Sequence, residues 1–344
     1  MYNPNLKYIV FLYLCLVSCA TTTDKPLQPI VITKAVFGDS DDPAIWVHKQ
    51  FPDSTIILGT DKDSENGGIY VFDIHGKIDS VRSKFNMKRV NNIDIANHFS
   101  YLDKDIAIAV ATERDRHSIR IYSIPQMQNI DGGGIEVFKD DTLNLPMGIA
   151  LYTNPENKKV YAIVGRKTGP NNGYLYQYLL YDSSGLVKAK LVRKFGKFSG
   201  KKEIESIAVD HELGYVYYSD EQYGIRKYYA HPDSSNIELA LFGQNDFKED
   251  NEGISIYKST NDSGYILVSD QSAHAFNVYS REGYNNNPHQ HRLVGRFTVT
   301  AKNSDGSEIS ASKLPGFAQG IFVVMSDDKT FHYYSWEQIK QHLF

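Results

Sequence analysis

The stretch Ser206-Ile207-Ala208-Val209 decides the fold, because its pattern recurs along the chain. A small residue, Ile, any residue and an aliphatic residue follow one another in six copies. These copies are Ala44-Ile45-Trp46-Val47, Asn92-Ile93-Asp94-Ile95, Gly148-Ile149-Ala150-Leu151, Ser206-Ile207-Ala208-Val209, Gly253-Ile254-Ser255-Ile256 and Gly320-Ile321-Phe322-Val323. Their Ile residues are separated by 48, 56, 58, 47 and 67 positions. Such spacing is typical of a β-propeller, in which each copy forms one blade of four strands.

The first five copies continue alike, since a second apolar strand ends in a small residue and two polar ones. These ends are Thr60-Asp61-Lys62, Thr112-Glu113-Arg114, Gly165-Arg166-Lys167, Ser219-Asp220-Glu221 and Ser269-Asp270-Gln271. The chain ends soon after the sixth copy, so the last blade lacks a strand. We therefore expect the strand-like residues 30–37 to pair into that blade and close the ring, which protects an edge. The pattern predicts an all-β, six-bladed propeller with four-stranded blades; a β-sandwich and two smaller domains are the alternatives.

The N-terminus is typical of an exported protein. Lys7 precedes an apolar run over residues 8–17, which has the length of a signal-peptide core. Leu16-Val17-Ser18-Cys19 then resembles the bacterial lipobox, in which the Cys is lipidated and becomes the first residue. We predict a signal peptide over residues 1–18, a tether over 19–29 and a propeller domain over 30–344. The protein would lie outside the cytoplasm, anchored to a bacterial membrane by a lipid on Cys19; a plain secretory signal is the alternative.

Composition narrows the possible partners. The 344 residues carry a formal net charge of −4, so there is no basic excess to hold a nucleic-acid backbone, and no nucleic-acid partner is expected. Both cysteines, Cys15 and Cys19, fall in the N-terminal segment, which leaves none for a disulfide in the domain. We expect a monomer that is held by its core, with metal as a further source of stability.

Equivalent positions of successive blades converge on one end of a propeller's central channel. Just before the repeated small residue the chain has Pro43, Asn91, Met147, Glu205, Glu252 and Gln319, and the second strands end in Lys62, Arg114, Lys167, Glu221 and Gln271. We expect three cations and three carboxylates to meet there, with Asp41, Asp42 and Asp94 nearby. Carboxylate clusters suit Ca²⁺, and Lys and Arg beside them suit phosphate oxygens. Any one of these residues alone is more typical of a solvated surface charge.

The same residues resemble a known family, the β-propeller phytases. The similarity lies in Asp39-Ser40-Asp41-Asp42-Pro43-Ala44-Ile45-Trp46, Asn91-Asn92-Ile93-Asp94-Ile95, Glu252-Gly253-Ile254-Ser255-Ile256-Tyr257 and Gly320-Ile321-Phe322-Val323, and it covers about residues 35–340. The resemblance implies a six-bladed propeller that needs several Ca²⁺ ions and hydrolyses phosphomonoesters of phytate (inositol hexakisphosphate), free or as calcium phytate.

The resemblance also implies roles for single residues. Asp41, Glu205, Glu221 and Glu252 would bind the catalytic calcium ions, while Lys62, Arg114 and Lys167 would hold phosphate. Asp42, Asp94 and the Asp305-Gly306 pair would form a tighter, structural calcium site. Asp250 and Gln271 would be ancillary ligands. Water activated by calcium would attack phosphorus directly, and Glu205, Glu221 or Glu252 would accept its proton.

Two departures from the family pattern stand out. Met147 occupies a position where the family has a Tyr in contact with phosphate, and Met cannot donate that hydrogen bond. The family's longer acidic segment is shortened here to Asp305-Gly306-Ser307-Glu308. Three other functions stay open: a calcium-dependent phosphoesterase with another substrate, a propeller lactonase or esterase, and a non-catalytic binding module. The cluster of Lys62, Arg114 and Lys167 argues against the lactonase, which needs no cations at the channel mouth.

Overall fold

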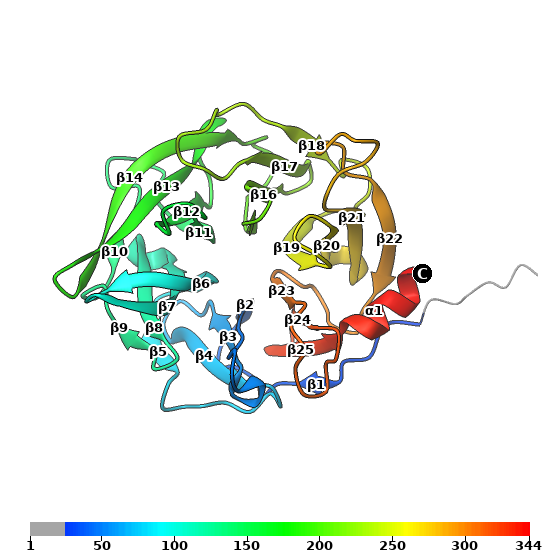
Figure 1. Cartoon of the computed structure of the whole chain (residues 1–344), viewed down its shortest axis with the longest axis horizontal. Coiled ribbons are helices and arrows are strands. Elements are labelled where there is room, and N and C mark those ends of the chain that lie inside the picture. Colours follow the sequence, from blue (N-terminus) through cyan, green and yellow to red (C-terminus); the bar gives the residue numbers. More distant parts are fainter. Residues whose placement is uncertain (1–24) are drawn as a thin grey trace, which may run out of the picture.

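A computed structural model of the chain describes residues 25–344, and the strands form six sheets arranged as a ring (Figure 1). The predicted six-bladed propeller is therefore confirmed. The inner strands of successive blades contact one another all the way around the ring. The lipobox and Cys19 lie outside the described residues.

Each blade is an antiparallel sheet whose strands follow one another from the channel outward. The first blade consists of β2 (Ser40–Trp46), β3 (Ile56–Asp61), β4 (Gly67–Asp73) and β5 (Lys84–Met87). The second blade consists of β6 (Val90–Tyr101), β7 (Lys104–Glu113), β8 (Ser118–Ile124) and β10 (Ile135–Glu136), and β9 (Gln128–Asn129) also pairs with β8. The third blade consists of β11 (Pro146–Thr153), β12 (Val160–Arg166), β13 (Asn172–Ser183) and β14 (Leu186–Lys197). The next two are β15 (Ile207–Asp210), β16 (Tyr215–Asp220), β17 (Gly224–Tyr229) and β18 (Ala240–Phe242); and β19 (Asn251–Lys258), β20 (Gly264–Asp270), β21 (Ala275–Ser280) and β22 (Leu293–Thr298).

The sixth blade joins the two ends of the described chain. It consists of β23 (Ser307–Ser310), β24 (Ile321–Ser326), β25 (Thr330–Ser335) and the N-terminal β1 (Val31–Ile32). Val31 pairs with Tyr333 and Ile32 with His332, so the predicted closure of the ring by an N-terminal strand is confirmed. A strand from the N-terminus thus covers the last exposed edge, which is the usual way in which a closed sheet architecture protects itself.

The sixth blade also corrects one expectation. Ile321 was expected in an inner strand, but it begins β24, the second strand of its blade, and the inner strand is β23. β23 has the sequence Ser307-Glu308-Ile309-Ser310, which is too polar to match the repeat. The apolar pattern at Ile321 arises because β24 is buried along its whole length.

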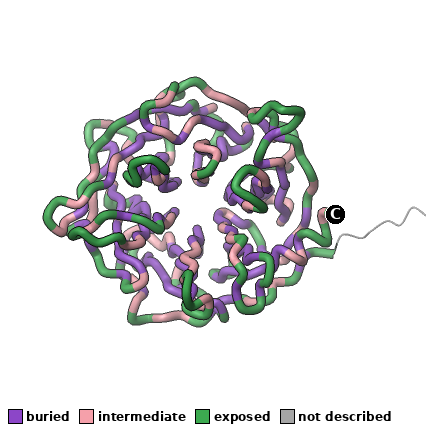
Figure 2. Tube along the Cα trace, viewed as in Figure 1, coloured by how far each residue is buried: buried purple, intermediate pink, exposed green. Residues whose placement is uncertain are grey.

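Side chains between the blades form the core. In the described chain the buried apolar residues fall into six clusters, each between two neighbouring blades. Figure 2 shows the buried strands in the body of each blade and the exposed loops around them. Packing of blade against blade therefore holds the inner strands at fixed positions around the channel.

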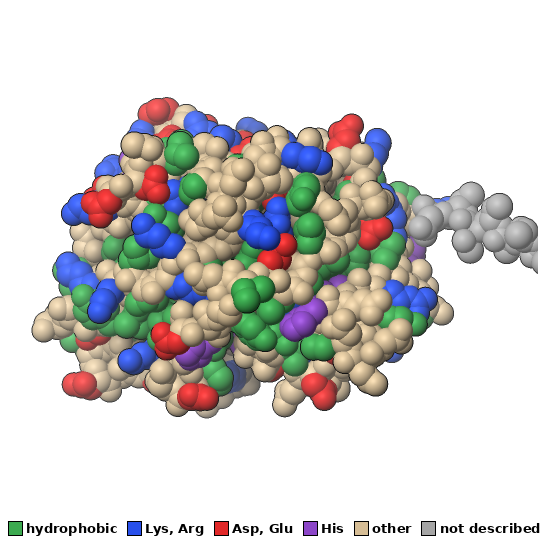
Figure 3. Space-filling model, turned by 90° about the horizontal axis from the view of Figure 1, so that it is seen from above, with side chains coloured by type: hydrophobic (Ala, Val, Ile, Leu, Met, Phe, Trp, Pro, Cys, Tyr) green, Lys and Arg blue, Asp and Glu red, His purple; other side chains and the backbone are tan. Residues whose placement is uncertain are grey.

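The remaining elements are short. The described chain has three 3₁₀ turns, η1 (Pro52–Ser54), η2 (Arg114–Arg116) and η3 (Gln271–Ala273), and one α-helix near the C-terminus, α1 (Trp336–Leu343). Ser335 and Gln338 form a capping box at the start of α1, and Trp336 stacks on Tyr257 with ring centroids 3.7 Å apart. No helix among residues 25–344 has the length and hydropathy of a membrane span. Charged side chains of both signs are interspersed over the side of the molecule seen in Figure 3.

Candidate active site

Six residues occupy equivalent positions at one end of the channel, near the start of the inner strand of each blade. In the first blade Ser40 pairs with Asp61 and Pro43 with Gly59, so the intervening two residues bulge out of the ladder. Bulges lie at the same place in the second, third and fifth blades. A β-bulge redirects side chains in this way near many active sites. The resulting channel ring consists of Asp41, Asn91, Met147, Glu205, Glu252 and Asp305.

This channel ring differs from the expected one at two positions. Pro43 was expected in it, but the register places Pro43 two residues further along the strand, and Asp41 takes the ring position. Gln319 was expected in the sixth blade, but Gln319 precedes the second strand there, and Asp305 precedes the inner strand. Both corrections replace an uncharged residue with a carboxylate, so the channel ring is more acidic than the repeat alone predicts.

A second set of residues lies beside the channel ring, at the ends of the second strands. Each backbone N–H donates to the carbonyl oxygen that stands two residues before a channel-ring residue. These hydrogen bonds join Lys62 to Asp39 (2.7 Å), Arg114 to Arg89 (2.9 Å), Lys167 to Leu145 (2.9 Å), Glu221 to Glu203 (3.1 Å) and Gln271 to Asp250 (3.2 Å). The fold therefore brings together the two sets of equivalent residues that the repeat predicts.

Hydroxyl groups hold the channel ring from the neighbouring blade. Oγ1 of Thr112 donates to the carbonyl oxygen of Met147 at 2.7 Å, and Oγ of Ser219 donates to that of Glu252 at 2.6 Å. Both hydroxyls are buried. In the second and fourth blades the small hydroxyl residue at the end of the second strand thus fixes the backbone of the next blade's channel-ring residue.

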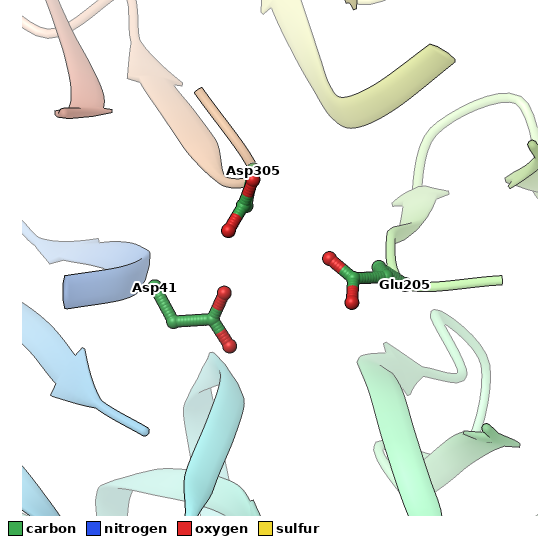
Figure 4. Close-up of side chains that lie close together, drawn as sticks. All are labelled: Asp41, Glu205 and Asp305. Atoms are coloured by element: carbon green, nitrogen blue, oxygen red, sulfur yellow. The ribbon is translucent and has the colours of Figure 1, made fainter. Parts of the chain in front are cut away.

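The carboxylates of this region form three overlapping groups. In each group one oxygen per residue lies within 4.8 Å of the others, and the groups are Asp41 with Glu205 and Asp305; Glu203 with Glu205 and Glu221; and Glu221 with Asp250 and Glu252. Figure 4 shows Asp41, Glu205 and Asp305 pointing toward one another from three separate parts of the ring. Because Glu205 and Glu221 each belong to two groups, the seven carboxylates form one continuous site.

Burial and crowding raise the pKa of these carboxyl groups. Burial raises the pKa of Glu205 well above its usual value, and the neighbouring charges of Asp41 and Asp305 raise it further. Burial raises the pKa of Glu252 well above its usual value, and the charge of Glu205 raises it further. Burial also raises the pKa of Glu221 to about 7, against the lowering effect of Lys202. A site that holds so much negative charge out of water favours a bound cation.

Three ammonium groups lie against the three carboxylate groups. Nζ of Lys62 lies 3.1 Å from Asp41 and 2.5 Å from Asp305. Nζ of Lys167 lies 2.8 Å from Glu203. Burial lowers the pKa of Lys62, but the charges of Asp41 and Asp305 outweigh that effect and raise it above its usual value.

The third ammonium belongs to Lys202, whose Nζ lies 2.8 Å from Glu221 and 2.7 Å from Asp250. Lys202 and Glu203 are absent from the residues selected by sequence, because they stand in a loop ahead of the repeated strand. The run Lys201-Lys202-Glu203-Ile204-Glu205 could have shown them, since it places three charged residues directly before a channel-ring position.

Arg114 differs from the lysines. It is buried, and within residues 25–344 it makes no ion pair with a carboxylate. Its Nη2 contacts Sδ of Met147, while its Nε has no hydrogen-bond partner in the described chain. A buried guanidinium with free donors beside an acidic site is suited to bind an anion with several oxygens.

A second acidic site lies deeper in the channel. Asp42, Asp94 and Glu308 line a cavity of about 200 Å³ between the inner strands. Burial raises the pKa of Asp94 to about 6, although the backbone N–H groups of Leu151 and Ile95 lower it. Burial and the charge of Asp94 raise the pKa of Glu308 to about 8.

The structure divides the residues expected at this second site. Gly306 packs against Asp42, and a Cβ added at Gly306 would lie 2.5 Å from Oδ1 of Asp42. The carboxylate of Asp305, however, turns to Lys62 and Asp41 in the channel ring, and its Oδ1 accepts from Nε2 of Gln271 at 2.5 Å. Glu308 supplies the third carboxylate of the channel cavity, where Asp305 was expected.

Comparison with known proteins is consistent with this geometry. A sequence model of the family described as Phytase matches residues 21–343. The chain is also 29% identical over 334 residues to the protein named 3-phytase of Bacillus subtilis (strain 168), and the alignment covers 88% of this chain and 81% of that relative. The family match spans the whole channel ring and the cations beside it.

Proposed function

The chain belongs to the phytase family of phosphomonoesterases, and from this premise we propose that it releases phosphate from phytate in a calcium-dependent reaction. The observation that carries the proposal is the continuous carboxylate site at the channel mouth, with Lys62, Arg114 and Lys167 beside it. A highly charged polyphosphate needs both cationic side chains and metal ions to offset its charge.

The residues present fit calcium. Every donor in the three groups is a carboxylate oxygen, and Ca²⁺ takes six to eight oxygen ligands in flexible geometry. Among the described residues no hydrogen-bond partner reaches Oε1 of Glu221 or Oε2 of Glu252, and both side chains are buried. Buried carboxylate oxygens without partners are costly, so their presence points to a cation. Asp41, Glu205, Glu221, Asp250, Glu252 and Asp305 would hold the ions.

Calcium, when bound there, would offset the charge of phosphate oxygens and lower the pKa of a nearby water. The chain's own residues would bind and orient the substrate. Arg114 offers a planar donor set for two phosphate oxygens, and Lys62 and Lys167 offer point charges on the same rim. Glu205, Glu221 or Glu252 would accept the proton of the attacking water, because these carboxylates lie within the site. Direct attack by water at phosphorus requires no covalent enzyme intermediate.

We also propose that the protein acts outside the cytoplasm on a lipid anchor, on the basis of Leu16-Val17-Ser18-Cys19. The described chain begins at the rim of the propeller, beside α1 (Figure 1). An anchor that leaves from the rim keeps the channel mouth open to a soluble substrate.

The decisive test measures phosphate release from phytate in the presence of calcium and again with excess chelator. We expect release with calcium and its loss with chelator. A phosphodiester and a simple aryl phosphate would be assayed in parallel to test another phosphoesterase activity. If no phosphoester is hydrolysed at any calcium concentration, the protein would instead be a binding module, and the proposal would fail.

A further inference from the structure

Three lysines contact the carboxylate groups, and two of them, Lys62 and Lys167, are already accounted for as phosphate ligands. Lys202 is the exception. Its Nζ lies 2.8 Å from Glu221, 2.7 Å from Asp250 and 3.8 Å from Glu252, so a single ammonium contacts every member of its group. A cation of this kind occupies the space in which a metal ion would meet the same oxygens.

The surroundings of Lys202 allow its side chain to move while the backbone stays fixed. The loop is anchored because the backbone N–H and Oγ of Ser199 donate to Asp220 at 2.9 and 2.7 Å. The side chain of Lys202 is 37% exposed, whereas those of Glu221 and Glu252 are 0% and 3% exposed. The ammonium of Lys202, on its flexible four-carbon side chain, can therefore move into solvent, whereas the buried carboxylates of Glu221 and Glu252 cannot.

We propose that Lys202 is a built-in counter-ion that competes with calcium for the group formed by Glu221, Asp250 and Glu252. Without calcium, the ammonium offsets the repulsion among three carboxylates, of which Glu221 and Glu252 are buried. When calcium binds, the same oxygens serve the metal and the two positive charges repel each other, so the ammonium swings out to the rim. This inference rests on the calcium site proposed above.

Calcium binding to the protein without substrate tests the proposal directly. The key variant is Lys202→Met, which keeps the length of the stem and removes the charge. Lys201→Met is the matched control, because Lys201 is its neighbour, has the same charge, and donates to the carbonyl oxygen of Gln222 at 3.0 Å and not to the carboxylate group. Lys202→Arg keeps the positive charge at the site.

Calorimetric titration should show that Lys202→Met binds calcium about tenfold more tightly than the unchanged protein, since a charge at this distance opposes the ion at a partly screened site. Lys201→Met and Lys202→Arg should stay within about threefold of the unchanged protein, because distant surface charge is screened. In chelator the melting temperature of Lys202→Met should fall below that of Lys201→Met, and calcium should remove the difference.

Two failures are distinguishable. If the unchanged protein binds no calcium, the proposed calcium site fails. If it binds calcium but Lys202→Met binds no more tightly than Lys201→Met, Lys202 does not compete for the site and this inference is overturned.

Discussion

Asp41 and Asp305 come from the first and the sixth blades, yet a carboxylate oxygen of each lies within 4.8 Å of the other. The ammonium of Lys62 joins them, at 3.1 Å from Asp41 and 2.5 Å from Asp305. The two blades are neighbours because the ring closes, with β2 of the first blade against β23 and β24 of the sixth. The acidic site therefore depends on ring closure, and a cation bound there would in turn hold the first and last blades together.

Removing one carboxylate should weaken calcium binding without abolishing chemistry. Glu252→Gln keeps the shape of a buried side chain but removes its charge, so activity on phytate should fall at low calcium and recover in part at high calcium. Initial rates across a calcium titration measure this. Activity that is equal to that of the unchanged protein at every calcium level would remove Glu252 from the site.

Loss of the buried guanidinium of Arg114 should reduce activity in a different way from loss of a carboxylate. Arg114→Ala loses charge-assisted hydrogen bonds that contribute about 1.5–3 kcal/mol, so kcat/KM should fall by about one to two decades. Added calcium should not restore it, because the loss lies in phosphate binding. Arg114→Lys is the control, because it keeps the charge but cannot contact two phosphate oxygens at once. Its kcat/KM should lie between that of the unchanged protein and that of Arg114→Ala. A calcium-rescued Arg114→Ala would place this residue in metal binding instead.

Glu308 makes the calcium-free protein sensitive to pH. Its pKa is raised from 4.5 to about 8, so the folded state binds this proton more tightly than the unfolded chain does. The contribution of this proton to the stability of the folded state is fully present below about pH 4.5 and is lost as pH rises through about 8. In chelator at pH 8, Glu308→Gln should be more stable than the unchanged protein by about 1 kcal/mol, because the amide removes a negative charge beside Asp94.

Thermal unfolding in chelator from pH 4.5 to 8 measures this effect. The gap between Glu308→Gln and the unchanged protein should widen with pH. A constant gap would show that the carboxylate does not titrate in this range.

Cys19 should determine where the protein is found. Cys19→Ala removes the lipidated side chain but leaves the apolar export signal, so the protein should move from the membrane fraction to the soluble exported fraction. Fractionation followed by immunoblotting measures this. An unchanged protein that is already fully soluble outside the membrane fraction would contradict the lipobox hypothesis.

Much of the fold was predictable because the propeller repeats itself. Inner strands such as the one around Ile207 share a buried face, so the same apolar pattern returned in each blade, and ring closure by an N-terminal strand followed from the missing strand. Lys62, Arg114 and Glu221 were predictable for the same reason, since residues at equivalent positions must converge.

The rest of the site lacked that signal. β23 is short and polar, so the hydrophobic pattern selected Ile321 in its place and missed Glu308. Pro43 was assigned to the channel ring because Ile45 lies two residues further from the bulge than Ile93, Ile149 and Ile254 do in their blades, and a bulge has no simple sequence pattern. Lys202 lies in a loop, where side-chain direction depends on contacts such as that between Ser199 and Asp220.

Met147 offers a test in which activity should be gained. It occupies a channel-ring position, is 1% exposed, and its Sδ contacts the guanidinium of Arg114. A thioether is a weak acceptor and donates nothing to phosphate.

Met147→Tyr would place a hydroxyl donor beside Arg114, and Met147→Phe is the matched control because it adds the same ring without the hydroxyl. A neutral hydrogen bond contributes about 0.5–1.5 kcal/mol, so kcat/KM on phytate should be about two- to tenfold higher for Met147→Tyr than for Met147→Phe. Relative to the unchanged protein, Met147→Tyr should hold or raise activity. Equal values for the two aromatic variants, with melting temperatures that match, would show that no phosphate oxygen comes within hydrogen-bond distance of a hydroxyl at this position.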